Sequence, residues 1–134
     1  MSTFPLKIVT ADGLVFDGPA EEIIVRTITG DMAVLARHMN CVTPLGMGRA
    51  TIVVDGERRY AACIGGLLSI VNGEVNLVPT TFEWADSIDA ERAEASKARA
   101  EKVLSNENAS DTDIKLAKAR LHRALVRTSV ASNK

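Results

Sequence analysis

The stretch TIVVDGERRYAACI, residues 51–64, decides the fold class of the first part of the chain. It places Asp-Gly between two apolar, β-branched runs, and this dipeptide tolerates the positive φ angles of a type I′ turn, whose twist suits a hairpin. The stretch LLSIVNGEVNLV, residues 67–78, repeats the pattern around Asn-Gly. The two stretches predict consecutive β-hairpins.

Toward the N-terminus, turn dipeptides again alternate with apolar segments. A third turn dipeptide lies in ADGL, and further segments of strand length surround it: LKIV (6–9), LVF (14–16) and EEIIVRTI (21–28). The hydrophobic content of 46% is enough for a core. Seven or more short strands before Trp84, with no helical stretch, predict a sandwich or a barrel.

After Trp84 the period changes to that of helices. Residues 85–105 contain no Gly or Pro and are rich in alanine, which favours a helix, and we expect Asp86 or Ser87 to cap its first turn. A polar break at residues 105–113 precedes a second helix, whose apolar stripe has three- and four-residue spacing: Ile114, Ala117, Leu121, Ala124, Leu125 and Thr128. The stripe of the first helix is thinner, with Ala90, Ala93, Ala100 and Leu104. We expect a weakly packed antiparallel pair, because alanines bury little area.

Enzyme chemistry has no recognisable motif in this chain. Phosphate-loop, nucleophile-elbow and dinucleotide-binding patterns are absent from the sequence, and the histidines at 38 and 122 are too isolated for a metal site. Cys41 and Cys63 form no CxxC motif, so we expect buried thiols. No run is long and apolar enough for a membrane helix, and the first residues lack a signal peptide's pattern. These features predict a soluble, cytosolic protein without catalytic activity, metal or required cofactor.

The charge is distributed unevenly along the chain. Its net value is −1, but residues 114–134 contain six basic and no acidic residues: Lys115, Lys118, Arg120, Arg123, Arg127 and Lys134. This pattern predicts a helix that docks on an acidic surface. Its cations could instead pair with Glu91, Glu94 and Glu101 of the neighbouring helix. Nucleic acid is the rival partner for a basic helix, but we do not expect it here, because the acidic sandwich would repel a duplex.

Several blocks, in order over nearly the full chain, resemble the epsilon subunit of rotary ATP synthases of the bacterial type. They are DGLVFDG (12–18), GDMAVLARH (30–38), PLGMGRATI (44–52), GGLLSIVNGEVNLV (65–78), IDAERAEASKARAEKVL (88–104) and LAKARLHRALVRTSVA (116–131). The chain departs from the family at Ala33, where glycine is usual, and at Ala36-Arg37, where Pro-Gly is frequent. In relatives these positions belong to a loop region facing the membrane rotor ring.

The resemblance implies an α+β fold, with an N-terminal antiparallel β-sandwich (residues 1–84) that binds rotor and stalk, and a C-terminal antiparallel two-helix hairpin (residues 85–134) with a regulatory role. It implies a non-catalytic central-stalk subunit that contacts gamma and the c subunits of the rotor ring, with Asp31 and His38 near the ring loops. Membrane association would be peripheral, on the cytoplasmic face and only through the complex. The hairpin would move from a compact to an extended form, in which its cations meet alpha and beta subunits of the catalytic head and inhibit ATP hydrolysis.

The block IDAERA, residues 88–93, is similar to the motif with which some epsilon subunits bind ATP. The resemblance implies a regulatory ATP site that includes Ile88, Asp89, Arg92 and Ala93, with Arg123 and Arg127 from the second helix. Asp89 would accept a hydrogen bond from the adenine or ribose, and the arginines would meet phosphate oxygens. Alternatively, Asp89 and Arg92 form an ordinary surface ion pair, worth about 0.2–0.5 kcal/mol. An alternative function is a free-standing nucleotide-sensing or adaptor domain.

Overall fold

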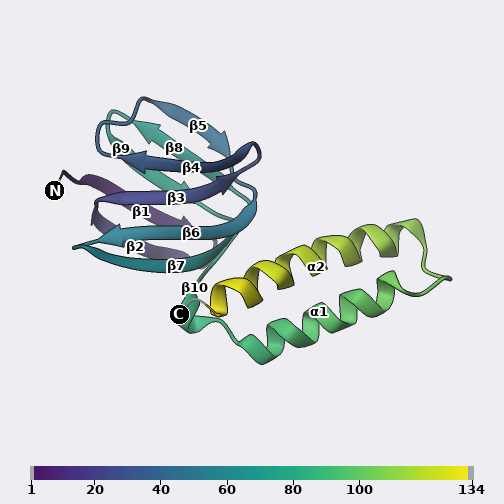
Figure 1. Ribbon diagram of the computed structural model, residues 1–134. Helices are drawn as coiled ribbons and strands as arrows, with labels where there is room; N and C mark the ends of the chain where they lie inside the picture. Colours follow the sequence, from purple (N-terminus) through teal and green to yellow (C-terminus); the bar gives the residue numbers. More distant parts are fainter. Residues whose placement is uncertain (1, 133–134) are drawn as a thin grey trace. The chain divides into compact units, whose positions relative to one another are not determined.

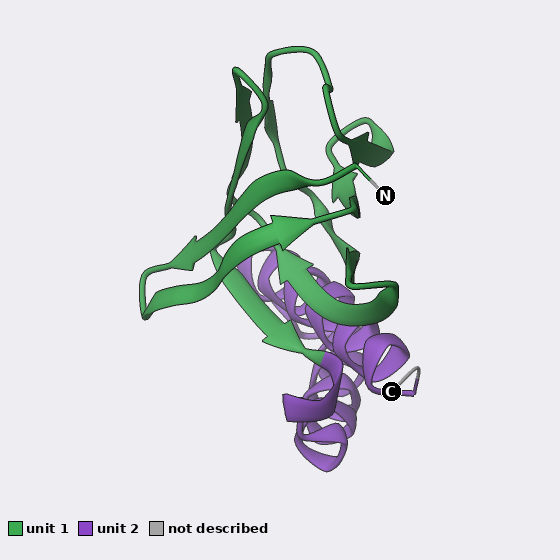
Figure 2. Cartoon of the chain, turned by 90° about the vertical axis from the view of Figure 1, so that its left-hand side faces the viewer, with its two compact units in different colours: residues 1–84 green, residues 85–134 purple. Residues whose placement is uncertain are grey.

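The structure is a computed structural model that describes residues 2–132. The chain divides into two compact units, Met1–Trp84 and Ala85–Lys134, coloured green and purple in Figure 2. Within the described residues, the first unit contains the strands β1 (Phe4–Thr10), β2 (Gly13–Ala20), β3 (Glu22–Thr27), β4 (Gly30–Leu35), β5 (Cys41–Pro44), β6 (Met47–Val54), β7 (Glu57–Ile64), β8 (Leu67–Val71), β9 (Glu74–Val78) and β10 (Thr81–Trp84). The second contains the 3₁₀ helix η1 (Ala85–Ser87) and the helices α1 (Ala90–Leu104) and α2 (Asp111–Ala131).

The strands form a sandwich of two five-stranded sheets, ordered β2-β1-β9-β8-β5 and β10-β7-β6-β3-β4 within the described chain. Figure 1 shows the strands of both layers. Paired strands are antiparallel with one exception, the parallel pair of β1 and β9, in which Leu6 lies opposite Val75. The predicted α+β fold class, a sandwich followed by a two-helix hairpin, is confirmed, and the barrel alternative is wrong.

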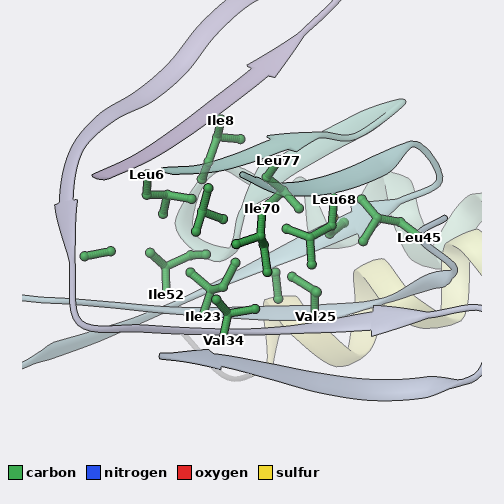
Figure 3. Close-up of a cluster of buried hydrophobic side chains, with 14 of the residues drawn as sticks. Leu6, Ile8, Ile23, Val25, Val34, Leu45, Ile52, Leu68, Ile70 and Leu77 are labelled. Carbon is green, nitrogen blue, oxygen red and sulfur yellow. The ribbon is translucent and has the colours of Figure 1, made fainter. Parts of the chain in front are cut away.

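The core lies between the inner faces of the two sheets. Figure 3 shows the aliphatic side chains that meet there, which include Leu6, Ile8, Ile23, Ile70 and Leu77. All five are almost completely buried. Successive side chains of a strand point to opposite faces, so alternate residues of each strand enter the core. Each such side chain stabilises the fold by about 1.5–3 kcal/mol relative to its exposed state.

Two of the three predicted turn dipeptides have the conformation expected of type I′ turns. Asp55 and Gly56 have φ angles of 53° and 76°, and Asn72 and Gly73 have φ angles of 52° and 82°. In the β1–β2 turn only Gly13 has a positive φ, of 123°. The first hairpin therefore turns differently, and its ladder contains an irregularity between Ile8 and Val9.

Three strands have no counterpart among the predicted segments: β4, β5 and β10. The expectation that Ala33 belongs to a loop is wrong, because it lies in β4 and pairs with Ile24. The loop begins after Leu35, and Arg37 adopts a φ of 65° there. Glycine tolerates this left-handed region without strain, whereas an L side chain rarely adopts it.

The second unit is an antiparallel helical hairpin (Figure 1). Small buried side chains recur every seven residues, with Ala93 and Ala100 in α1 and Ala117 and Ala124 in α2, and Val130 near the end of α2 is buried as well. Leu125, expected in the apolar stripe, is 43% exposed. Alanines bury little apolar area, so weak packing of the two helices stays a prediction.

Candidate functional site

Asp89 is the residue that begins α1. Its backbone is extended (φ −80°, ψ 99°), and its carboxylate accepts a hydrogen bond of 3.0 Å from the backbone N–H of Arg92. This is the N-cap arrangement, in which a side-chain oxygen satisfies one of the free N–H groups of the first helical turn. The helix dipole also favours a carboxylate at this end. The three-residue spacing of Asp89 and Arg92 thus has a structural cause.

This geometry corrects two expectations. Asp86 and Ser87 do not cap α1, because both lie in the 3₁₀ helix that precedes Asp89. The contact between Asp89 and Arg92 goes to the backbone N–H of Arg92, so it is a cap and not an ion pair with the guanidinium. The guanidinium of Arg92 is therefore exposed and available to a ligand or partner.

We expect Asp89→Ala to destabilise the helical hairpin by about 1 kcal/mol, because the cap is lost. Asp89→Asn should leave the stability nearly unchanged, since asparagine caps as well as aspartate. Amide hydrogen exchange of residues 90–104 measures both effects. Equal protection in the alanine variant and the wild type would contradict the capping role.

The other residues of the predicted ATP site lie on the same helical unit. Ile88 and Ala93 are buried, so they can line a site but offer it no charge. Arg123 is exposed and Arg127 is partly buried, one turn apart on α2. Arg92 precedes the buried Ala93 in α1, and Arg123 precedes the buried Ala124 in α2.

The basic residues of α2 face solvent. Lys115, Lys118, Arg120 and Arg123 are exposed. Within residues 2–132 none of these four makes an ion pair with an acid of α1, which contradicts the expected pairing with Glu91, Glu94 and Glu101. Lys134, the sixth cation, lies outside the described residues. The face is therefore a concentration of positive charge that no neighbouring acid neutralises at contact distance.

Asp31 and His38, the predicted contacts of the ring loops, lie toward opposite ends of β4. Asp31 is the second residue of β4. Its carboxylate lies 3.0 Å from the guanidinium of Arg26, the residue of β3 that is paired with it. His38 follows the other end of β4, and its Nδ1 lies 2.9 Å from the carbonyl oxygen of Met39. The β4 residues between them span about 13 Å at ~3.3 Å per residue. Arg26, which the sequence did not single out, could have been found from the hairpin register.

An apolar row crosses the outer face of the first sheet. Leu14 lies opposite Val9, Val78 opposite Leu67, and Leu67 opposite Pro44, and directly opposed residues share a face of the sheet. Leu14, Leu67 and Val78 are 61%, 48% and 47% exposed. Because Ile8 pairs with Leu77 in parallel, Val9 continues the row toward Val78. Sequence patterning could not reveal this row, since it depends on which strands are neighbours. Contiguous apolar surface of this kind is typical of protein–protein interaction sites.

The described residues contain no group of His, Cys, Asp and Glu side chains that could hold a metal ion. No described helix is long and apolar enough to cross a membrane. Burial raises the pKa of the Cys63 thiol to about 12, which makes it unreactive at neutral pH. Cys41 is only partly buried, so the expectation of two buried thiols holds for one of them.

Comparisons with known proteins cover the whole of both units. Residues 3–85 match the family model described as ATP synthase, Delta/Epsilon chain, beta-sandwich domain, and residues 86–132 match its long alpha-helix domain. An ATP synthase epsilon chain of Bacillus velezensis is 41% identical over 99% of this chain and 100% of its own. That of Bacillus subtilis is 39% identical over 86% of each chain.

Solved structures share the fold at low identity. A chain of the Euglena gracilis mitochondrial ATP synthase complex (OSCP/F1/c-ring) is similar with a TM-score of 0.85 at 19% identity, over 100% of this chain and 83% of that one. A chain of the Tetrahymena thermophila mitochondrial ATP synthase (central stalk/c-ring) is similar with a TM-score of 0.62 at 13% identity, over 95% of each chain. At these identities the likeness establishes the fold alone.

Proposed function

Since the chain belongs to the delta/epsilon family of ATP synthase subunits, we propose that it is a non-catalytic epsilon subunit that connects the catalytic head of a rotary ATP synthase to its membrane ring. The observation that carries the proposal is the match to both family domains in order, together with relatives named epsilon chains along nearly the full length. In this role the protein is a peripheral membrane component on the cytoplasmic face, attached only through the complex.

Two surfaces of the sandwich suit protein partners in this assembly. The apolar row of Leu14, Val9, Val78, Leu67 and Pro44 offers a docking face for the gamma subunit, because contact there removes exposed apolar area from water. The polar surface around Asp31 and the loop of His38 are separate contacts for the c subunits of the ring. A stable complex with gamma on co-purification distinguishes this role from that of a free-standing nucleotide sensor.

The helical hairpin is the regulatory part in this proposal. Its alanine-rich interface is weak enough for the helices to leave one another, and α2, with 21 residues, is about 30 Å long. Extended, its exposed cations would meet acidic segments of the alpha and beta subunits and inhibit hydrolysis. Charge complementarity of this kind favours the correct partner and register.

We expect removal of the chain after Ser87 to leave assembly intact and to raise ATP hydrolysis by the complex about 5-fold or more, the range of a 1–3 kcal/mol coupling. Steady-state hydrolysis by purified complexes measures this. A full-length variant with Lys115, Lys118, Arg120 and Arg123 changed to glutamine should be activated in the same direction. Unchanged hydrolysis in the truncated complex would refute the inhibitory role.

ATP is proposed as the regulatory ligand that favours the compact hairpin. A ligand shifts an equilibrium only by its difference in affinity for the two states, so ATP must contact both helices. Arg92 of α1 and Arg123 of α2 are both exposed and can donate charge-assisted bonds to phosphate oxygens.

We expect calorimetry to detect saturable ATP binding that weakens about 10-fold or more in Arg92→Ala and Arg123→Ala, because a bond to a charged group contributes about 1.5–3 kcal/mol. Asp89→Asn retains the cap, so any loss of affinity there reports on contact with the ligand. Absence of binding at millimolar ATP would refute the site and leave the subunit assignment standing.

A further inference from the structure

A pocket of about 250 Å³ opens in the sandwich unit, and its lining shares no residue with the candidate sites described above. Its apolar lining consists of Phe16 of β2, Ile52 and Val54 of β6 and Trp84 of β10, and its charged lining consists of Asp55, Glu57 and Arg59. Ile52 belongs to the core, so the pocket lies where the interior between the sheets reaches the surface.

The charges in this pocket break the pattern of β7. Glu57 lies directly opposite Val54 and Arg59 opposite Ile52, so both share the inward face of the sheet with Ala61 and Cys63. Ala61 and Cys63 are buried, as inward positions normally are. Glu57 and Arg59 are exposed, unlike Ala61 and Cys63, because they lie at the end of β7 beside the Asp55-Gly56 turn.

Arg59 and Trp84 are held in a defined stack. The guanidinium carbon of Arg59 lies 3.7 Å from the centroid of the indole ring. Phe82 meets the same indole edge to face, with ring centroids 5.0 Å apart and planes at 89°. Within residues 2–132 no carboxylate or carbonyl oxygen accepts a hydrogen bond from Arg59. The stack thus fixes a planar cation whose N–H groups remain available.

The charged and aromatic side chains that line the pocket determine which kind of ligand it can bind. An anion would meet the carboxylates of Asp55 and Glu57, and a cation would meet Arg59, so both are disfavoured. A neutral planar ring avoids both conflicts, because it stacks on aromatic and guanidinium planes. An amino group on it can donate to a carboxylate, and a ring acceptor can receive an N–H of arginine.

We propose that this pocket binds the base of an uncharged nucleoside that has both an exocyclic amino group and ring acceptors, such as cytidine or adenosine. The carboxylates of Asp55 and Glu57 disfavour the corresponding nucleotides, since phosphate is repelled. The site is therefore distinct in residues and in ligand charge from the ATP site proposed on the helices, and it does not rest on that proposal.

Trp84 is the only tryptophan of the chain, so its fluorescence reports directly on the pocket. We expect cytidine and adenosine to change the emission of the full-length protein saturably, and uridine and the 5′-monophosphates to bind about 5-fold or more weakly. Phe16→Leu, Arg59→Lys and Glu57→Gln should each weaken cytidine binding about 5-fold or more, because each removes one stacking or hydrogen-bonding partner. Arg58→Lys, on the opposite face of β7, is the matched control and should bind as the wild type does.

Three results would overturn the proposal. The first is emission that falls only linearly with nucleoside concentration, as in collisional quenching. The second is tighter binding of the monophosphates than of the nucleosides. The third is binding lost in Arg92→Ala but kept in Arg59→Lys, which would assign the nucleoside to the helical unit.

Discussion

Gly66→Ala is expected to prevent the sandwich from folding stably. Gly66 has a φ of 97°, and a Cβ there would overlap the carbonyl oxygen of Val78 and lie 2.6 Å from the Cα of Pro79. Both obstacles are backbone atoms, which no side-chain rotation can move away. β8 and β9 would have to separate at the row where Leu67 pairs with Val78. We expect a loss of about 4 kcal/mol or more, the exceptional end of single substitutions, measured by urea unfolding of the sandwich.

Gly73→Ala is the matched control for this substitution. Gly73 also has a positive φ, of 82°, but a Cβ there would meet no atom within 4 Å. Its loss should therefore reflect backbone strain alone, about 1–2 kcal/mol. Similar losses for the two variants would show that the overlap with β9 is relieved elsewhere, and our account of Gly66 would be wrong.

Ala93→Leu is expected to separate the two helices while the sandwich stays folded. Ala93 is completely buried in the hairpin, where small side chains allow close approach. Extra methylenes in a packed interface cost about 1–3 kcal/mol, a large fraction of what a mainly alanine interface provides. Hydrogen exchange of residues 90–131 should accelerate, whereas amides of β6 and β7 should exchange as before.

The control for the helical substitution is Ala95→Leu, on the exposed face of α1. It adds the same atoms at a position of similar helix propensity, so exchange should be nearly unchanged. In the assembled complex, Ala93→Leu should also change ATP hydrolysis relative to Ala95→Leu. Unaltered exchange in Ala93→Leu would mean that the interface has more room than its burial indicates.

The parts of the fold that the sequence predicts are those set by neighbouring residues. The dipeptides Asp55-Gly56 and Asn72-Gly73 predict their turns, because few dipeptides accept two positive φ angles. β5 is less visible, since it has four residues and ends in Pro44. The sequence does not identify which residue caps α1, because Asp86, Ser87 and Asp89 are all good capping residues. The preceding 3₁₀ turn decides among them.

The candidate sites likewise include features that follow from local sequence and features that depend on distant strands. The helical positions of Arg92 and Arg123 follow from periodicity, so the sequence places one arginine on each helix. The stack of Arg59 on Trp84 could not, because it joins β7 to β10 through a pairing that no local pattern reveals. The ion pair of Arg26 with Asp31 is intermediate, since it needs the exact register of a hairpin but no distant strand.

The parallel pairing of β1 with β9 has a consequence for how the chain folds during synthesis. The first sheet consists of the β1–β2 hairpin and the β5, β8 and β9 strands, joined only by contacts between residues such as Leu6 and Val75, 69 positions apart. Loop closure of that length is slow compared with hairpin formation. During synthesis the N-terminal hairpin must wait until β9 has left the ribosome. β10 and then the helical unit follow β9 in the chain, so they leave the ribosome after the strands of the first sheet.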